Sequence, residues 1–221
     1  MPIVTLEDLP DGPLIALDPG SKTIGVAACG ASRGLSTPVE TIKRAPDGIT
    51  IRDRSGSNRT FDHVVIAASA TKGGSVAQLP LAAAKASMES KFWGAYRVAR
   101  AAKVVDGGSI TLVSGFLSHR PSATSVLQGA INAALEALGR GLALERAPVR
   151  VNTVSPGLID TPLWRGMPDT DRKAMFARTA ERLPARRVGQ PEDIAQAILF
   201  VSTNPFATGS TITVDGGGTI A

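Results

Sequence analysis

Polar and glycine-containing turns end two apolar strand runs in the middle of the chain, and these turns are the first places to look for chemistry. The run 109–113 ends in Ser114-Gly115, and the run 149–154 ends in Ser155-Pro156-Gly157. The Ala/Leu-rich segment 125–146 lies between them, which is the pattern of a parallel strand-helix-strand crossover. Ligands of open α/β sheets bind outside the carboxyl ends of the strands. We therefore expect the site beside Gly115 and Gly157.

A second candidate is the glycine-rich turn that follows the short strand 14–17. Gly20 and Gly25 could open a helix whose backbone N–H groups hold a pyrophosphate. Alternatively, the polar residues 18–23 form the turn of a β-hairpin. We favour the hairpin, because glycine and proline interrupt the chain too soon for a long helix, at Gly30, Gly34 and Pro38.

Composition bounds the class of protein. The 221 residues are 43% hydrophobic and 19% charged, which predicts one globular domain with a sizeable core. No apolar run is long enough for a membrane span. The first eight residues carry acid where a secretory signal carries base, so we expect a cytoplasmic protein.

The net charge of +5 is uneven, because basic residues gather in 165–187. The chain has few aromatic residues for base stacking and no Lys/Arg block, so nucleic-acid binding is disfavoured. A solvated helix face or the rim of an anionic-ligand site explains the basic segment better. No metal site is predicted, because His63 and His119 lack metal-ligand spacing, and we interpret the single cysteine, Cys29, as a small core residue.

The elements that must position the site alternate from residue 61 onward. We predict strands at 64–67, 109–114, 149–154 and 211–214, and helices at 81–105, 125–146, 169–183 and 191–202. This order predicts a Rossmann-like, mostly parallel, doubly wound α/β sheet. The part before it is short and turn-rich, so we expect an atypical N-terminal part built as a β-hairpin, with a seam near 44–61.

Four motifs of this second part resemble the short-chain dehydrogenase/reductase family in order and spacing. They are Gly107–Ser114, Val149–Gly157, Gln190–Ala195 and Val214–Gly217. The resemblance covers 61–221 and implies a Rossmann-type fold. It also implies hydride transfer between NAD or NADP and a small alcohol or carbonyl compound.

The resemblance implies roles for single residues at the cofactor end. Pro156, Gly157 and Thr161 match the turn that lies along the nicotinamide. Ala68-Ser69 stands where the family has an Ala-Gly pair at the end of the strand that begins at Val64, and Lys91 stands where the family has an assisting asparagine. Gly20 and Gly25 would belong to the glycine-rich turn.

At the catalytic end the chain departs from the family pattern. Gly115 stands at the usual serine position with Ser114 beside it, and Gln128 and Asn132 stand at the tyrosine and lysine positions. The family's tyrosine passes a proton to the substrate oxygen, and its lysine lowers the pKa of that tyrosine. Glutamine has no titratable proton at neutral pH, and asparagine carries no charge. We therefore predict a catalytic set of Ser114, Gln128 and Asn132 with weak or lost activity by the usual route.

Residues 1–44 resemble the opening of a Holliday-junction resolvase family with an RNase H-like fold, in which Asp18 matches a metal-binding aspartate. We therefore divide the chain into a 1–44 fragment, a 45–60 connection and the 61–221 domain. A metal-dependent nuclease acting through Asp18 is one alternative function, although one carboxylate does not make a two-metal site.

A non-catalytic scaffold is another alternative. The helices at 81–105 and 125–146 correspond to the family's dimer interface, so we expect a homodimer or homotetramer.

Overall fold

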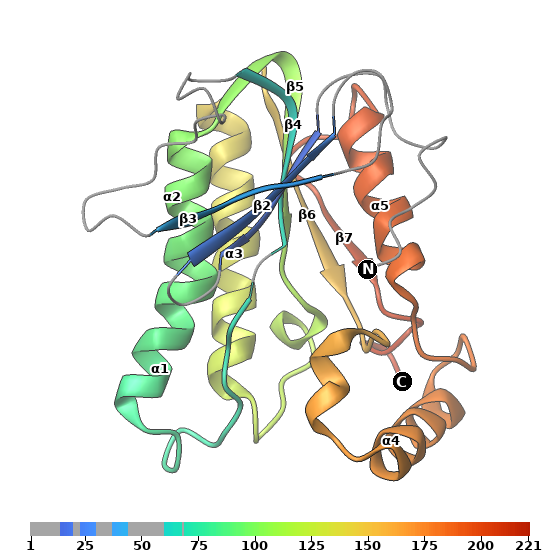
Figure 1. Cartoon of the computed structure of the whole chain (residues 1–221). Coiled ribbons are helices and arrows are strands. Elements are labelled where there is room, and N and C mark those ends of the chain that lie inside the picture. The colour runs from blue at the N-terminus through green and yellow to red at the C-terminus, as the bar shows by residue number, and fades with distance from the viewer. Residues whose placement is uncertain (1–13, 20–22, 30–36, 44–59, 68) are drawn as a thin grey trace.

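A single seven-stranded sheet runs through the protein in the order β3-β2-β1-β4-β5-β6-β7. The computed structural model describes residues 14–19, 23–29, 37–43, 60–67 and 69–221 (Figure 1). Strands β4 to β7 pair in parallel, as predicted. Their bounds are Thr60–Ile66, Lys103–Val113, Arg150–Pro156 and Thr211–Val214. The predicted Rossmann-like fold class is confirmed.

The N-terminal strands build the other half of the sheet. β1 (Leu14–Pro19) pairs in parallel with β4, whereas β2 (Thr23–Cys29) pairs antiparallel with both β1 and β3 (Thr37–Lys43). This confirms the hairpin. Three residues connect β1 to β2 and seven connect β2 to β3, too few for the crossover helices of a parallel sheet.

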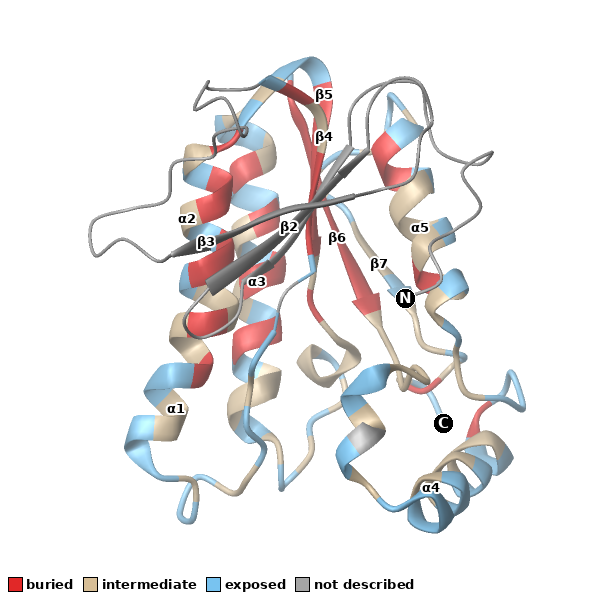
Figure 2. Ribbon diagram, viewed as in Figure 1, coloured by how far each residue is buried: buried red, intermediate tan, exposed pale blue. Residues whose placement is uncertain are grey.

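Helices cover the parallel part of the sheet on both faces (Figure 1). One face carries α1 (Leu81–Met88), α2 (Gly94–Ala101) and α3 (Val126–Glu145), and the other carries α5 (Pro191–Thr203). Period-two alternation in the strands supplies both cores. Val64, Ile110 and Leu112 pack against α2 and α3, whereas Val154 packs against α5. The buried residues concentrate along these contacts (Figure 2).

The prediction of one helix over 81–105 is wrong at its C-terminal end. The helix stops at Ala101, and β5 begins at Lys103. Residues 103 and 104 pair with Thr60 and Phe61, so the β-branched Val104 belongs to a strand. Asp106-Gly107-Gly108, which follow the predicted helix directly, lie within β5 beside a break in register, and Gly107 has a positive φ of 76°.

The remaining segments gather at the carboxyl ends of the parallel strands. The short 3-10 helix η3 (Phe116–Ser118) follows β5, and a second one, η4 (Pro162–Gly166), follows β6. The helix α4 (Asp169–Arg182) comes next and lies at the lower edge of the molecule in Figure 1. Among the described residues, no helix combines the length and the apolar character that crossing a bilayer requires.

Candidate active site at the carboxyl ends of β5 and β6

Lys91 reaches the site from an interruption in a helix. Residues Glu89–Trp93 form a π-helical segment, η2, between α1 and α2. Such segments insert an extra residue into a helical turn and are frequent at functional sites. Here the segment directs Lys91 toward the end of β5 and toward α3.

The Lys91 amine makes two short hydrogen bonds there. Nζ donates to the carbonyl oxygen of Ser114 and to Oδ1 of Asn132, each at 2.6 Å. Burial lowers the pKa of Lys91 to about 8, and the negative charge of Glu136 opposes part of that shift. The third hydrogen of the amine has no partner in the described part of the chain. Lys91 can therefore exchange a proton near neutral pH.

The amide of Asn132 is oriented by this contact. A lysine only donates hydrogen bonds, so Oδ1 must face Lys91 and the NH₂ group must point the other way. That NH₂ group lies against Gly115, since a Cβ atom at position 115 would stand 2.8 Å from Nδ2. Asn132 is buried, and its Nδ2 bonds to no described residue. It is thus a hydrogen-bond donor held ready beside the end of β5.

A buried carboxylate lies one helical turn beyond Asn132. Glu136 Oε1 accepts hydrogen bonds from Ser114 Oγ at 3.0 Å and from Ser118 Oγ at 2.6 Å. Its Oε2 lies 3.2 Å from Nε2 of the half-exposed His119. The Ser114 hydroxyl therefore donates its hydrogen bond to Glu136. This leaves Asn132 as the better-placed donor for a ligand at Gly115.

Gln128, the third predicted catalytic residue, lies on the same helix but has a different neighbour. Its Nε2 donates to Thr71 Oγ1 at 3.1 Å, which ties α3 to the loop that follows β4. The structure therefore brings Ser114, Asn132 and Lys91 together, and it places Gln128 against that loop.

The predicted cofactor residues at the end of β6 form a close turn. Gly157 N donates to Val214 O at 2.9 Å, and a Cβ atom at position 157 would stand 2.6 Å from the Asp215 Cα. Only glycine fits so close an approach. Pro156 ends β6 opposite Val214, and Thr161 immediately precedes η4. Because β6 pairs with β5 up to Val154, the turn at Pro156 and Gly157 lies beside the end of β5.

The N-terminal cofactor candidates have a different position. Gly25 lies inside β2, paired with Asp18 and with Thr41, so it does not open a helix. Gly20 and Ala68 lie outside the described residues.

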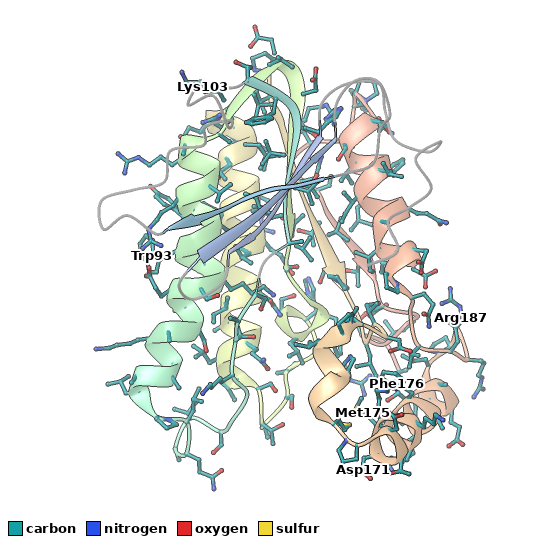
Figure 3. All side chains as sticks on the ribbon, viewed as in Figure 1. Trp93, Lys103, Asp171, Met175, Phe176 and Arg187 are labelled. Atoms are coloured by element: carbon teal, nitrogen blue, oxygen red, sulfur yellow. The ribbon has the colours of Figure 1, made fainter. Side chains whose placement is uncertain are left out.

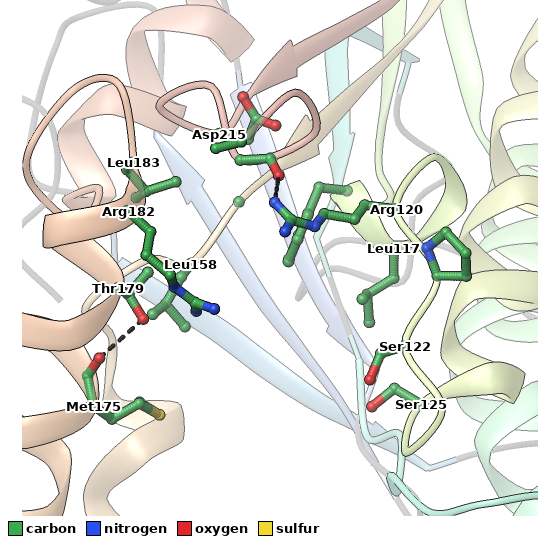
Figure 4. A pocket seen from close by; sticks show the side chains of 15 residues that line it. Leu117, Arg120, Ser122, Ser125, Leu158, Met175, Thr179, Arg182, Leu183 and Asp215 are labelled. Carbon is green, nitrogen blue, oxygen red and sulfur yellow. Dashed lines mark hydrogen bonds between the residues drawn. The ribbon is translucent and has the colours of Figure 1, made fainter.

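A cavity of about 350 Å³ opens next to Gly157 and to Phe116, the residue after Gly115. Its walls come from the loop after β5, the turn after β6, α4 and the C-terminal residues (Figure 4). The sequence did not single out Arg182, which lines this cavity, or Glu136, which bonds Ser114 and Ser118. Glu136 was detectable as a charged residue four positions after Asn132 on an inward-facing helix. Arg182 was indicated only by its place in the basic segment 165–187.

Comparisons with known proteins identify the framework. A family model described as enoyl-(acyl carrier protein) reductase matches residues 51–219. The chain belongs to the short-chain dehydrogenase/reductase family. A small-chain dehydrogenase solved in complex with NADPH is 43% identical, with a TM-score of 0.72 over 73% of this chain and 75% of that one.

Other family members differ in substrate and in active site. Cis-4-hydroxycyclohexanecarboxylate dehydrogenase of Sinomonas cyclohexanicum is 38% identical over 50% of this chain and 44% of its own length. The chain thus spans less than half the length of the curated relatives it matches. An NADPH-bound short-chain oxidoreductase of Pseudomonas aeruginosa PAO1, described as containing an atypical catalytic center, is 28% identical. Its TM-score is 0.65 over 71% of this chain and 65% of that one.

The nuclease alternative gains no support. No group of three or more potential metal ligands occurs among the residues with described side chains. The comparisons relate residues 51–219 to dehydrogenases.

Proposed function

We propose that the protein is an NADP(H)-dependent oxidoreductase of small carbonyl and alcohol compounds in which Lys91 and Asn132 replace the family's tyrosine and lysine. The observation that carries this proposal is the 2.6 Å hydrogen bond from Lys91 Nζ to Asn132 Oδ1, which turns the amide NH₂ toward Gly115. Relative to the family pattern, the two residue types have exchanged places. Lys91, on η2, stands at the family's asparagine position, and Asn132, on α3, stands at the family's lysine position.

Each residue has a distinct role in this proposal. Asn132 Nδ2 donates a hydrogen bond to the substrate carbonyl oxygen above Gly115, where negative charge develops during reduction. Lys91 holds the amide in place, and its third N–H, which has no partner in the described part of the chain, supplies the proton to this oxygen through a bridging water, because the amide NH₂ points away from the amine. In the reverse direction Lys91 takes the proton of the alcohol. Burial of its amine places its pKa at about 8, which suits proton transfer in both directions.

The nicotinamide end of the cofactor fits the described residues better than the other end does. Pro156, Gly157 and Thr161 would lie along the nicotinamide, which supplies or accepts a hydride when bound. Two similar structures described with NADPH support the choice of NADP(H). No described residue supplies the helix N-terminus that would hold the pyrophosphate after β1, since only three residues separate β1 from β2.

A matched pair of asparagine variants tests the function. The wild type should oxidise NADPH in the presence of small ketones or aldehydes. Asn132→Asp cannot donate to the carbonyl oxygen, so kcat/KM should fall by about 10²–10³. Asn204→Asp, at the C-terminal end of α5, makes the same chemical change away from the site and should leave activity unchanged. Full activity in Asn132→Asp, or no turnover by the wild type, would refute the proposal.

We also propose that the protein works in the cytoplasm as a homodimer or homotetramer through α1, α2 and α3. Trp93 and Tyr96 support this: they are 43% and 40% exposed, and their rings meet edge to face at 5.6 Å. Trp93 lies at the outer edge of the helical layer (Figure 3). Light scattering should give a dimer or tetramer mass for the wild type and a smaller mass for Trp93→Glu. A monomeric wild type would refute the assembly.

A further inference from the structure

Two arginines enter the cavity beside Gly157 from opposite walls. Arg120 comes from the loop that follows η3, and Arg182 comes from the last turn of α4. In Figure 4 both guanidinium groups point into the space between α4 and that loop. Two positive charges therefore face the region where a substrate would extend away from Asn132.

The protein does not neutralise these charges in its described part. The Arg182 side chain has no hydrogen bond or ion pair there. Arg120 donates through Nη1 to the carbonyl oxygen of Gly218, which holds its guanidinium in place without cancelling its charge. A guanidinium presents five donors, so Arg120 keeps donors available for a ligand.

The one acidic side chain of the cavity wall is already engaged. Asp215 Oδ1 accepts from Gly217 N at 2.9 Å, and Oδ2 accepts from Thr219 N at 2.7 Å. It therefore serves the turn after β7 and forms no ion pair with either arginine. Ser122 and Ser125 add hydroxyl groups to the same side of the cavity as Arg120.

The rest of the wall is apolar and limits the size of the ligand. Leu117, Leu158, Met175 and Leu183 also line the cavity. A volume of about 350 Å³ is that of a small-molecule site. The cavity thus suits a short hydrocarbon body with one anionic end.

We infer that the cavity selects carbonyl and alcohol substrates that carry a carboxylate, which Arg182 and Arg120 bind at the end remote from the reacting carbon. A carboxylate accepts two parallel N–H bonds from one guanidinium, so it matches this donor geometry. The inference rests on the proposed function for the reaction itself, but carboxylate binding stands on the arginines alone.

A matched substrate pair tests the inference in the full chain with NADPH. The probes are 4-oxo-4-phenylbutanoate and its primary amide, which share a skeleton and differ in the charge of one end. The wild type should reduce the acid with a kcat/KM at least about tenfold above that of the amide, because charged hydrogen bonds to the acid are lost in the amide. Arg182→Gln should abolish this preference by raising KM for the acid and should leave the amide unaffected.

The control is Arg178→Gln, one turn earlier on α4, which is exposed and does not line the cavity. It should keep the preference for the acid. Equal reduction of acid and amide by the wild type, or an undiminished preference in Arg182→Gln, would overturn the inference while the proposed function stands.

Calorimetric titration of both probes separates the two proposals. One outcome is that no carbonyl compound is reduced, but the acid binds more tightly than the amide and Arg182→Gln removes this difference in affinity. In that case the proposed function fails and the carboxylate site remains. Equal binding of acid and amide to the wild type would overturn the carboxylate site directly.

Discussion

Lys91 and Asn132 depend on each other for their proposed roles. The amine needs the Oδ1 atom as an acceptor in a buried place, and the amide needs the amine to fix which end faces Gly115. Neither side chain alone would define a donor at a known position. This mutual dependence explains how a site without the family's tyrosine can still be ordered.

The pH dependence of the reaction should report on Lys91. Its pKa of about 8 means that the proton needed for carbonyl reduction is present below pH 8 and is lost as the pH rises through that value. The rate of reduction should therefore fall above pH 8, and the rate of alcohol oxidation should rise. Lys91→Met should lose most of the activity and this pH dependence, as measured by initial rates from pH 6 to 10.

The same shift affects folding stability. The pKa of Lys91 is lower in the folded protein than its ordinary value of 10.5, so the unfolded chain binds more protons between about pH 8 and 10.5. This group therefore makes the free energy of unfolding rise with pH in that window, and Lys91→Met should lack this contribution. Parallel pH profiles for both proteins, in rate and in stability, would contradict a lowered pKa.

At the scale of the element, the start of α5 is held by an acidic residue with three hydrogen bonds. Asp193 accepts two from Arg187, at 2.6 and 2.7 Å, and one from Gln190 N at 2.7 Å. The bonds from Arg187, followed by that from Gln190, lower the pKa of Asp193 to about 2. In Figure 3 Arg187 lies beside this end of α5.

Removing this cap should weaken the fold measurably. Asp193→Ala should lower the free energy of unfolding by about 1 kcal/mol at neutral pH, because it removes the N3 side chain of the capping box, which accepts from the backbone N–H of the N-cap residue Gln190. The difference should persist above pH 3.8 and shrink as the pH falls toward 2, where the carboxylate of the wild type becomes protonated. Glu192→Ala removes an adjacent acid of the same turn and should cost less in urea denaturation. Equal losses in the free energy of unfolding for both variants would mean that the negative charge near the start of α5, and not the hydrogen bonds of Asp193, stabilises the helix.

Local patterns were enough to predict most elements but not the contacts of the site. The helix α3 and the strands β4 to β7 have strong apolar periodicity, and the hairpin followed from glycine and proline spacing. The Lys91–Asn132 contact joins residues 41 positions apart. It also requires a π-helical segment that no sequence pattern marked. The end of α2 was missed because the alanine-rich sequence runs up to Ala102, directly before β5, and strand pairing with β4 decides the boundary.

At the scale of the whole molecule, the two halves of the sheet differ in what they offer a dinucleotide. The carboxyl ends of β5 and β6 carry the proposed site, whereas β1 is followed by an antiparallel partner, β2. A parallel sheet would place a helix N-terminus after β1, which is where a pyrophosphate gains backbone hydrogen bonds. The nicotinamide end should therefore contribute most of the cofactor's binding energy.

This asymmetry predicts a tolerance for truncated cofactors. Reduced nicotinamide mononucleotide should support a kcat/KM within about tenfold of that of NADPH, because the adenosine end should add little binding energy. A tenfold difference corresponds to ~1.4 kcal/mol of transition-state binding. Steady-state rates with both cofactors and one ketone measure the ratio. A preference for NADPH above about a thousandfold, ~4 kcal/mol, would show that the adenosine end is bound strongly after all.

The π-helical segment Glu89–Trp93 has an evolutionary consequence. An α-helix turns by about 100° per residue, so deleting one residue from this segment would restore regular winding and swing Lys91 away from Asn132. A deletion of one codon in this segment would therefore break the Lys91–Asn132 contact even if every side chain of the site were retained. Lineages of this chain could gain or lose the lysine contact by insertion or deletion, a change that a count of substitutions at positions 91 and 132 would miss.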